Sequence, residues 1–193
     1  MIYPIVKYGN PVLEKTAEKV TVFDAELEKL IEDMFESMYE AHGVGLAAPQ
    51  IGIGRRIAVI DVTFKEDPKA KLVLINPEII KASGEQIGPE GCLSIPGYIG
   101  ENSKRSMMVL VKGRDVHGKE MRVRADSFFA RILQHEIDHL DGILYLDRLQ
   151  RPEDLRRLLE DEETGEVKPE SSKTPGKAEI AGATSSPTES STN

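Results

Sequence analysis

Apolar side chains recur with helical spacing between residues 23 and 41, and this pattern predicts the first long helix of the chain. Asp24 is placed to cap the helix at its N-terminus, and Gly43 is placed to stop it. The buried stripe of this helix is expected to consist of Leu27, Leu30, Ile31, Met34, Phe35 and Met38.

Short runs of apolar and β-branched residues predict strands in the middle of the chain. Residues 56–62 form one such run, and residues 72–75 form another, which the Asn-Pro pair at 76–77 should close. Residues 107–114 and 120–123 are expected to pair as a hairpin. Because the strands come first and a long helix follows late, the pattern favours an α+β fold over a βαβ series.

That later helix begins near Asp126 or Ser127, either of which can cap a helix N-terminus. Gly142 stands where a glycine should end it. The residues that recur with helical spacing between these two ends are Phe128, Phe129, Ile132, Leu133, His135, Glu136, His139 and Leu140.

The string His135-Glu136-Ile137-Asp138-His139 gives this helix its chemistry. Two imidazoles four positions apart lie one above the other on one helical face, where both can bind one metal ion. The Glu136 carboxylate lies beside them but points away, so it is placed for proton transfer to a bound water rather than for ligation. The string predicts metal-assisted hydrolysis, and zinc endopeptidases are one class of enzyme that carries such a motif.

The end of the chain differs in composition. Pro152 opens a charged segment, residues 153–163, which is predicted to be a short surface helix. From Thr164 onward the sequence is rich in Ser, Thr, Pro, Gly and Lys and nearly lacks apolar residues, so residues 164–193 are expected to form a disordered tail. Residues 1–163 are expected to be a single catalytic domain.

Charge and cysteine usage narrow the class of protein. The net charge of −8 and the lack of a long basic run argue against a nucleic-acid-binding surface. No apolar stretch of 18 residues is present, and the N-terminus lacks the pattern of a signal peptide, so neither a membrane span nor secretion is expected. The single Cys92 cannot form an internal disulfide, which suits a cytoplasmic protein.

Two histidines rarely hold a catalytic ion alone, so a third ligand is expected. The downstream carboxylates Glu153 and those of residues 160–163 belong to a charged surface segment. Cys92, flanked by Gly91 and a turn sequence, is the better candidate. A thiolate with two imidazoles would leave one position open for water.

The loop Gly43-Val44-Gly45-Leu46-Ala47-Ala48-Pro49-Gln50 formally fits a dinucleotide-binding fingerprint. A helix precedes it and a strand follows, whereas the fingerprint requires the reverse order. Paired glycines would instead let a peptide lie flat against this backbone. Gln50 would offer an amide donor to a developing oxyanion. His42 and His117 lack ligand spacing and are expected to be surface residues.

Three strings taken together resemble the motifs of peptide deformylase, in the same order: residues 43–50, residues 90–94 and residues 134–142. The likeness runs from about Tyr3 to Leu149. The resemblance implies a bacterial, cytoplasmic hydrolase that removes the formyl group from the N-terminal formylmethionine of nascent polypeptides and releases formate. It also implies antiparallel sheets packed around a central metal-binding helix.

The resemblance further implies one Fe²⁺ ion per chain, with Zn²⁺ or Ni²⁺ as substitutes, and a role for each matching residue. Cys92, His135 and His139 would be the metal ligands, and Glu136 would be the general acid and base. Nascent formylmethionyl peptides would be the partners, with the ribosome near its exit tunnel as a further candidate.

Substrate contacts follow from the same resemblance. Gln50 and the backbone N–H of Leu93 would bind the oxyanion, and Val44, Gly45 and Gly91 would align the peptide. Val44 stands where many members of the family carry Ile.

The methionine pocket would draw on Phe128, Arg131 and Ile132 at the start of the metal-binding helix. Arg131 is unexpected in an apolar pocket, so its stem is expected to line the wall with its charge in solvent.

A zinc endopeptidase remains the alternative enzyme, although it gives Cys92 no role. A purely structural metal site would normally need a fourth protein ligand, and no further Cys or suitably spaced His is available.

Overall fold

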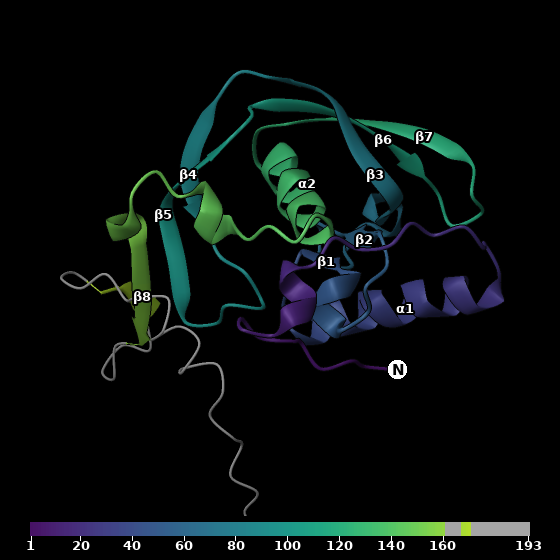
Figure 1. Ribbon diagram of the computed structural model, residues 1–193, viewed down its shortest axis with the longest axis horizontal. Helices are drawn as coiled ribbons and strands as arrows, with labels where there is room; N and C mark the ends of the chain where they lie inside the picture. The colour runs from purple at the N-terminus through teal and green to yellow at the C-terminus, as the bar shows by residue number, and fades with distance from the viewer. Residues whose placement is uncertain (161–166, 171–193) are drawn as a thin grey trace, which may run out of the picture.

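Two α-helices and two antiparallel sheets form the part of the chain that the computed structural model describes, residues 1–160 and 167–170 (Figure 1). The helices are α1 (Ala25–Glu40) and α2 (Ser127–Leu140). One sheet, in the order β1-β2-β3-β6-β7, contains Gly45–Ala47, Ile57–Ile60, Leu72–Ser83, Met108–Arg114 and Glu120–Asp126. The other, in the order β4-β5-β8-β9, contains Gln86–Glu90, Tyr98–Arg105, Leu155–Glu160 and Val167–Pro169. Short 3-10 helices are Pro11–Glu14, Ala48–Ile51, Pro68–Ala70, Tyr145–Arg148 and Pro152–Asp154. The α+β class with antiparallel sheets is confirmed.

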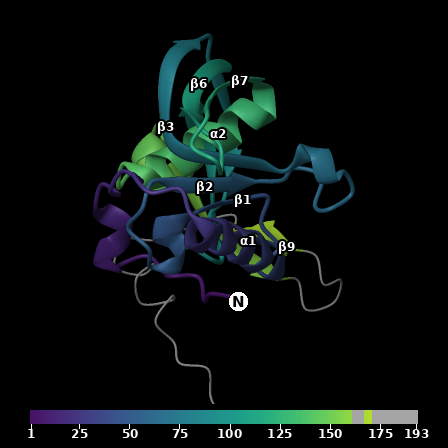
Figure 2. The ribbon, with the colours of Figure 1, turned by 90° about the vertical axis from the view of Figure 1, so that its right-hand side faces the viewer.

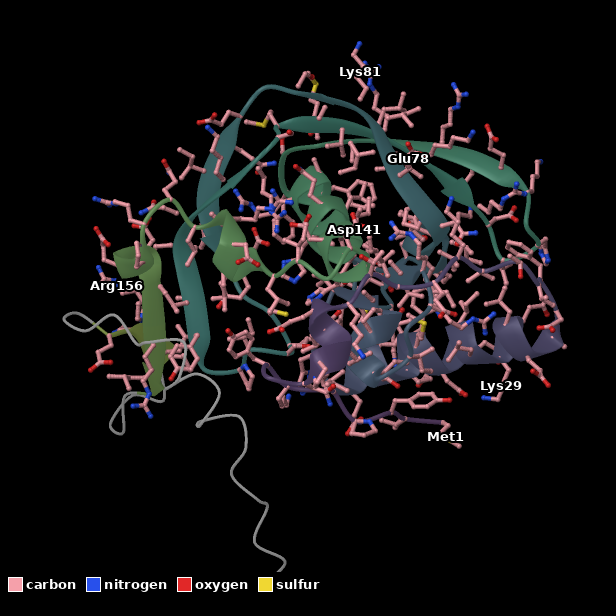
Figure 3. All side chains as sticks on the ribbon, viewed as in Figure 1. Met1, Lys29, Glu78, Lys81, Asp141 and Arg156 are labelled. Atoms are coloured by element: carbon pink, nitrogen blue, oxygen red, sulfur yellow. The ribbon has the colours of Figure 1, made fainter. Side chains whose placement is uncertain are left out.

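Helix α1 follows the predicted pattern closely. Asp24 caps it by accepting a hydrogen bond from the Leu27 backbone N–H at 3.0 Å. Its apolar stripe packs on β1 and β2, below which it lies in both views (Figures 1 and 2). At the end of β2, Asp61 accepts a hydrogen bond of 2.6 Å from the Tyr39 hydroxyl, which ties the helix to that sheet. Figure 3 shows Met1 and Lys29 beside α1, where both bond to Asp33.

Helix α2 occupies the middle of the molecule, between the five-stranded sheet and strands β4 and β5 (Figure 1). Its residues 130–140 are all buried. Ile132, Leu133 and Ile137 share a core cluster with Val109 and Val111 of β6. A helix that is covered on both sides can present polar residues only to partners inside the protein, and the histidine string belongs to this helix.

Strand β3 does not end at residue 75, as the Asn-Pro pair predicted, but continues to Ser83. Asn76 adopts a left-handed conformation with φ of 52°, and its side-chain amide bonds the Val20 backbone N–H and C=O at 2.9 and 2.8 Å. The register of β3 against β6 shifts between Ile75 and Glu78. A bulge therefore absorbs Pro77 without ending the strand.

The surface helix predicted for residues 153–163 is wrong where the structure describes that segment. Leu155–Glu160 form β8, because Tyr98, Ile99 and Gly100 of β5 pair with its first residues, and Leu155 is buried. Val167–Pro169, in the segment predicted to be disordered, form β9 beside β8. Residues 161–166 and 171–193 lie outside the described part of the chain. Strands β4 and β5 were not predicted, since their sequences lack a clear alternation of apolar residues.

Candidate metal centre and central cavity

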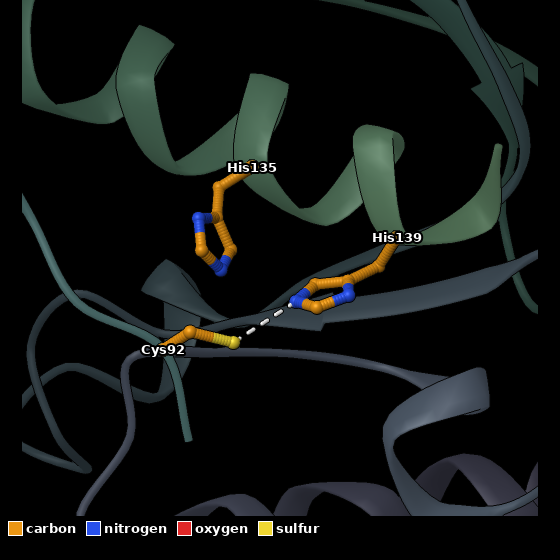
Figure 4. Close-up of side chains that lie close together, drawn as sticks. All are labelled: Cys92, His135 and His139. Carbon is orange, nitrogen blue, oxygen red and sulfur yellow. Dashed lines mark hydrogen bonds between the residues drawn. The ribbon is translucent and has the colours of Figure 1, made fainter. Parts of the chain in front are cut away.

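The structure brings Cys92, His135 and His139 together (Figure 4). One ligand atom from each lies within 4.8 Å of the other two, and Cys92 Sγ is 3.2 Å from His139 Nε2. The histidines come from successive turns of α2, and Cys92 comes from the segment between β4 and β5. Gly142, with φ of 74°, follows the end of α2 as predicted.

This donor set fits a transition-metal ion. Burial alone would raise the pKa of the Cys92 thiol, but the adjacent His139 and His135 outweigh burial and hold this pKa well below its usual range. A lowered pKa favours the thiolate, which is the form that binds metal. One thiolate and two imidazoles suit zinc or iron and leave room for a water or substrate ligand.

Glu90 orients the ring of His135 by contacting the ring nitrogen that does not face Cys92. Its Oε1 lies 2.5 Å from His135 Nδ1, and its Oε2 accepts hydrogen bonds from Ser103 at 2.8 Å and Arg105 Nε at 3.1 Å. Burial would raise the pKa of Glu90, but the bonds to His135 and Arg105 hold it well below its usual range. A carboxylate on Nδ1 leaves Nε2 of His135 free to face Cys92 and fixes the orientation of the ring.

The ionic network extends away from the metal centre through Asp138, which lies between the two histidines in the sequence. Arg105 bonds Asp138 as well as Glu90, and Arg148 Nη2 donates to Asp138 Oδ1 at 2.7 Å. Sequence reasoning assigned no role to Glu90, Arg105 or Asp138. The sequence did show Glu90 close to Cys92 and Asp138 between the two histidines. The pairing of both carboxylates with Arg105 of β5, however, depends on the fold.

Glu136 is buried, and among the described residues its Oε2 has no hydrogen-bond partner. Burial is the main cause that raises its pKa above the usual range. Gly45 of β1 lies directly against it, because a Cβ built on Gly45 would be 2.4 Å from Glu136 Oε1. Only a glycine therefore leaves space for this carboxylate.

Gln50 points its amide nitrogen at the centre. Its Oε1 accepts a hydrogen bond from the Ala47 backbone N–H at 2.8 Å, which fixes the orientation of the amide. Its Nε2 then lies 3.6 Å from Cys92 Sγ and 3.5 Å from Ser94 Oγ. A neutral donor is thereby held beside the three ligands.

A central cavity of about 410 Å³ opens at the metal centre. All of the residues predicted to contact substrate lie on its wall, namely Val44, Gly45, Gln50, Gly91, Leu93, Phe128 and Ile132. Its volume falls in the range of small-ligand sites, roughly 300–1,000 Å³. The side chain of Phe128 is 62% exposed, which places it at the mouth rather than at the base.

Of three expectations about nearby residues, the one for Arg131 is wrong and those for His42 and His117 are confirmed. Arg131 lines the cavity, but its guanidinium is buried rather than in solvent, since Nη1 donates to Glu90 Oε2 at 2.9 Å and to the Ser103 carbonyl at 3.1 Å. His42 and His117 are both exposed, as expected of surface residues, although His42 also lines the central cavity.

Glu153, one of the rejected third-ligand candidates, is exposed, and its Oε1 lies 3.9 Å from Nε of Arg151. The side chains of residues 160–163, the other rejected candidates, lie outside the described part of the chain.

Comparison with known proteins gives consistent matches. The polypeptide deformylase family model matches residues 2–154. A peptide deformylase of Acidobacterium capsulatum is 52% identical over 169 residues, covering 86% of this chain and 99% of the relative. One of Thermomicrobium roseum is 49% identical over 168 residues, covering 84% and 95%.

Solved structures agree with these sequence matches. Peptide deformylases of Legionella pneumophila and Thermus thermophilus each give a TM-score of 0.75, at 42% and 43% identity, covering 80% of this chain and 89% of theirs. Among the residues that the structure describes, no helix has both the length and the apolar character needed to cross a membrane.

Proposed function

Because this chain belongs to the polypeptide deformylase family, we propose that it hydrolyses the formyl group from N-formylmethionyl peptides and releases formate. The observation that carries this proposal is the cluster of Cys92, His135 and His139, at a cavity where Glu136 Oε2 is buried without a hydrogen-bond partner among the described residues. Nascent polypeptides would be the substrates, and the ribosome near its exit tunnel a candidate partner, which implies action in the bacterial cytoplasm.

The three ligand residues would hold one metal ion, Fe²⁺ by analogy with the family, with Zn²⁺ or Ni²⁺ as substitutes. When bound, such an ion supplies Lewis-acid polarisation of a carbonyl and lowers the pKa of a water molecule. Glu90 would keep His135 oriented for this ligation through its short contact with Nδ1.

Glu136 would move the proton. Its carboxylate accepts a proton from the attacking water and returns it to the amine that leaves as the new N-terminus. Burial, which raises its pKa, brings it closer to the pH at which a group can both accept and donate. Gly45 supports this role by leaving room for the carboxylate.

The remaining cavity residues would bind and orient the peptide. Gln50 Nε2, held by the bond from Ala47 to its Oε1, donates to the oxygen that becomes an oxyanion, and the backbone N–H of Leu93 adds a second donor. Val44, Gly45 and Gly91 would align the substrate backbone.

Phe128 and Ile132, on the α2 side of the cavity, would contact the methionine side chain. These functions all belong to residues 1–163, the proposed catalytic domain. Residues 164–193, proposed as its tail, contribute Val167–Pro169 (β9) to the sheet beside β8.

The test is formate release from formyl-Met-Ala-Ser by anaerobically purified protein of measured metal content. Glu136→Gln should retain metal and lose about 10²–10⁴-fold in kcat, the usual contribution of a positioned acid or base. Glu153→Gln, at an exposed site, should behave like the parent.

If metallated Glu136→Gln releases formate at the parent rate, the proton-transfer role is wrong. If the parent instead cleaves an internal bond of an acetylated peptide and leaves formyl-Met-Ala-Ser intact, it is a zinc endopeptidase.

A further inference from the structure

Strand β8 lies beyond the segment that matches the family model, which ends at residue 154. It is nevertheless fixed to the core of the protein. Tyr98 of β5 pairs with Arg157, and the Leu158 backbone N–H donates to the Gly97 carbonyl at 2.7 Å. Leu155, at the start of β8, is buried in the same core cluster as Tyr98. Figure 1 shows β8 alongside β5.

Side chains along β8 alternate between its two faces. Leu158 is half-buried and lines the central cavity, whereas its neighbour Leu159 is 43% exposed. Arg156, labelled in Figure 3, bonds Glu101 of β5 through Nε at 3.1 Å and adds a second cross-strand attachment. The position of Leu158 in the cavity wall is therefore set by the sheet.

The apolar wall residues of the central cavity come from several parts of the chain, and Val44, Leu93 and Ile95 are among them. Phe128 and Ile132 come from α2, and Leu158 comes from the four-stranded sheet, next to Pro96 and Tyr98, which also line the cavity. The methionine of the proposed substrate has a single side chain, which the α2 residues accommodate. The apolar wall at Leu158 remains for a different part of the peptide.

We propose that Leu158 is a specificity-determining residue, which contacts the peptide beyond its formylated methionine and favours an apolar side chain at the next position. This inference rests on the proposed function, since it names a preference of the same site. Removing apolar contact area from the wall weakens the binding of an apolar side chain in proportion to the area lost. A polar side chain of the substrate gains little binding free energy from that wall, so its binding should change little when Leu158 is replaced.

The experiment compares Leu158→Ser with Leu159→Ser, a matched change on the opposite face of β8. Formate release is measured with formyl-Met-Leu-Ser and formyl-Met-Ser-Ser, and Tm is recorded for each variant. Leu158→Ser should lower kcat/KM about tenfold for the leucine peptide, mainly through KM, and no more than about twofold for the serine peptide. Leu159→Ser should change neither value, and Leu158→Met should restore the preference.

Equal losses for both peptides, or the same loss in Leu159→Ser, would indicate a structural effect of β8 and would overturn the inference. So would an unchanged preference in Leu158→Ser. These outcomes are distinct from a failure of the proposed function, in which the parent protein itself would release no formate from either peptide.

Discussion

Replacing Gly45 with alanine places a methyl group where the Glu136 carboxylate now lies. The new Cβ would be 2.4 Å from Oε1, 2.9 Å from Cδ and 3.1 Å from Cγ of Glu136. Because Cγ is affected as well as the terminal oxygen, rotating the carboxylate does not relieve the clash. Glu136 is buried at 4% exposure, so its whole side chain has to move within a packed interior.

The size of the displacement sets the expected effect. Ordinary van der Waals contact begins at 3.4 Å, so Oε1 must move by about 1 Å. A misplacement of about 1 Å in a catalytic group can cost about 10²-fold in rate, which corresponds to about 2.7 kcal/mol. Overpacking in the core should also lower the free energy of unfolding by about 1–3 kcal/mol.

The assay measures kcat for formate release, metal content and Tm for Gly45→Ala, with Gly54→Ala as control. Apart from Gly54 itself and its two chain neighbours, no heavy atom of the described residues lies within 4 Å of a Cβ built on Gly54, so that change should leave kcat unaltered. Metal content should also stay constant in Gly45→Ala, since the three atoms nearest to the new Cβ all belong to Glu136 and none to a metal ligand. If folded Gly45→Ala keeps kcat within about threefold of the parent, the close fit between Gly45 and Glu136 does not control the reaction.

Further predictions concern the ligands, their support and stability. Cys92→Ala should retain little metal after dialysis against a chelator, as measured by elemental analysis, because two imidazoles alone form an incomplete set. Glu90→Gln should weaken metal affinity about 10–100-fold in a competition titration, since its carboxylate orients His135; parent-like affinity would contradict that role. Burial would raise the pKa of Asp61, but hydrogen bonds from Tyr39, Thr63 and Lys65 lower it from 3.8 to about 2. Because the pKa of Asp61 is lower in the folded state, its ionised carboxylate stabilises the fold above about pH 4. This contribution is lost as the pH falls from about 4 to 2. Urea unfolding at pH 5 and pH 3 should therefore show a smaller loss of stability on acidification for Asp61→Asn than for the parent, and identical losses would contradict this assignment.

Two predictions that depended on the local spacing of helical residues succeeded in this chain. The four-residue interval between His135 and His139 needs only a helix, and α2 forms where its apolar spacing predicts. The Asp24 cap of α1 was likewise readable because the capping bond spans three residues.

Predictions that depended on distant partners were incomplete. The charged sequence of residues 155–160 favoured a helix, but pairing with β5 made it a strand, because tertiary contacts override local propensity. The guanidinium of Arg131 was placed in solvent because its partner Glu90, 41 positions away, could not be known from the sequence pattern.

The shared use of the Glu90 carboxylate also limits how this chain can change during evolution. Its two oxygens serve Ser103, Arg105, Arg131 and His135 at once. Loss of Glu90 would leave the buried guanidinium of Arg131 without its carboxylate partner, at about 3–5 kcal/mol, a large part of the stability of a typical domain. These positions cannot drift independently, so descendants of this sequence should either keep the group intact or replace several of its members together.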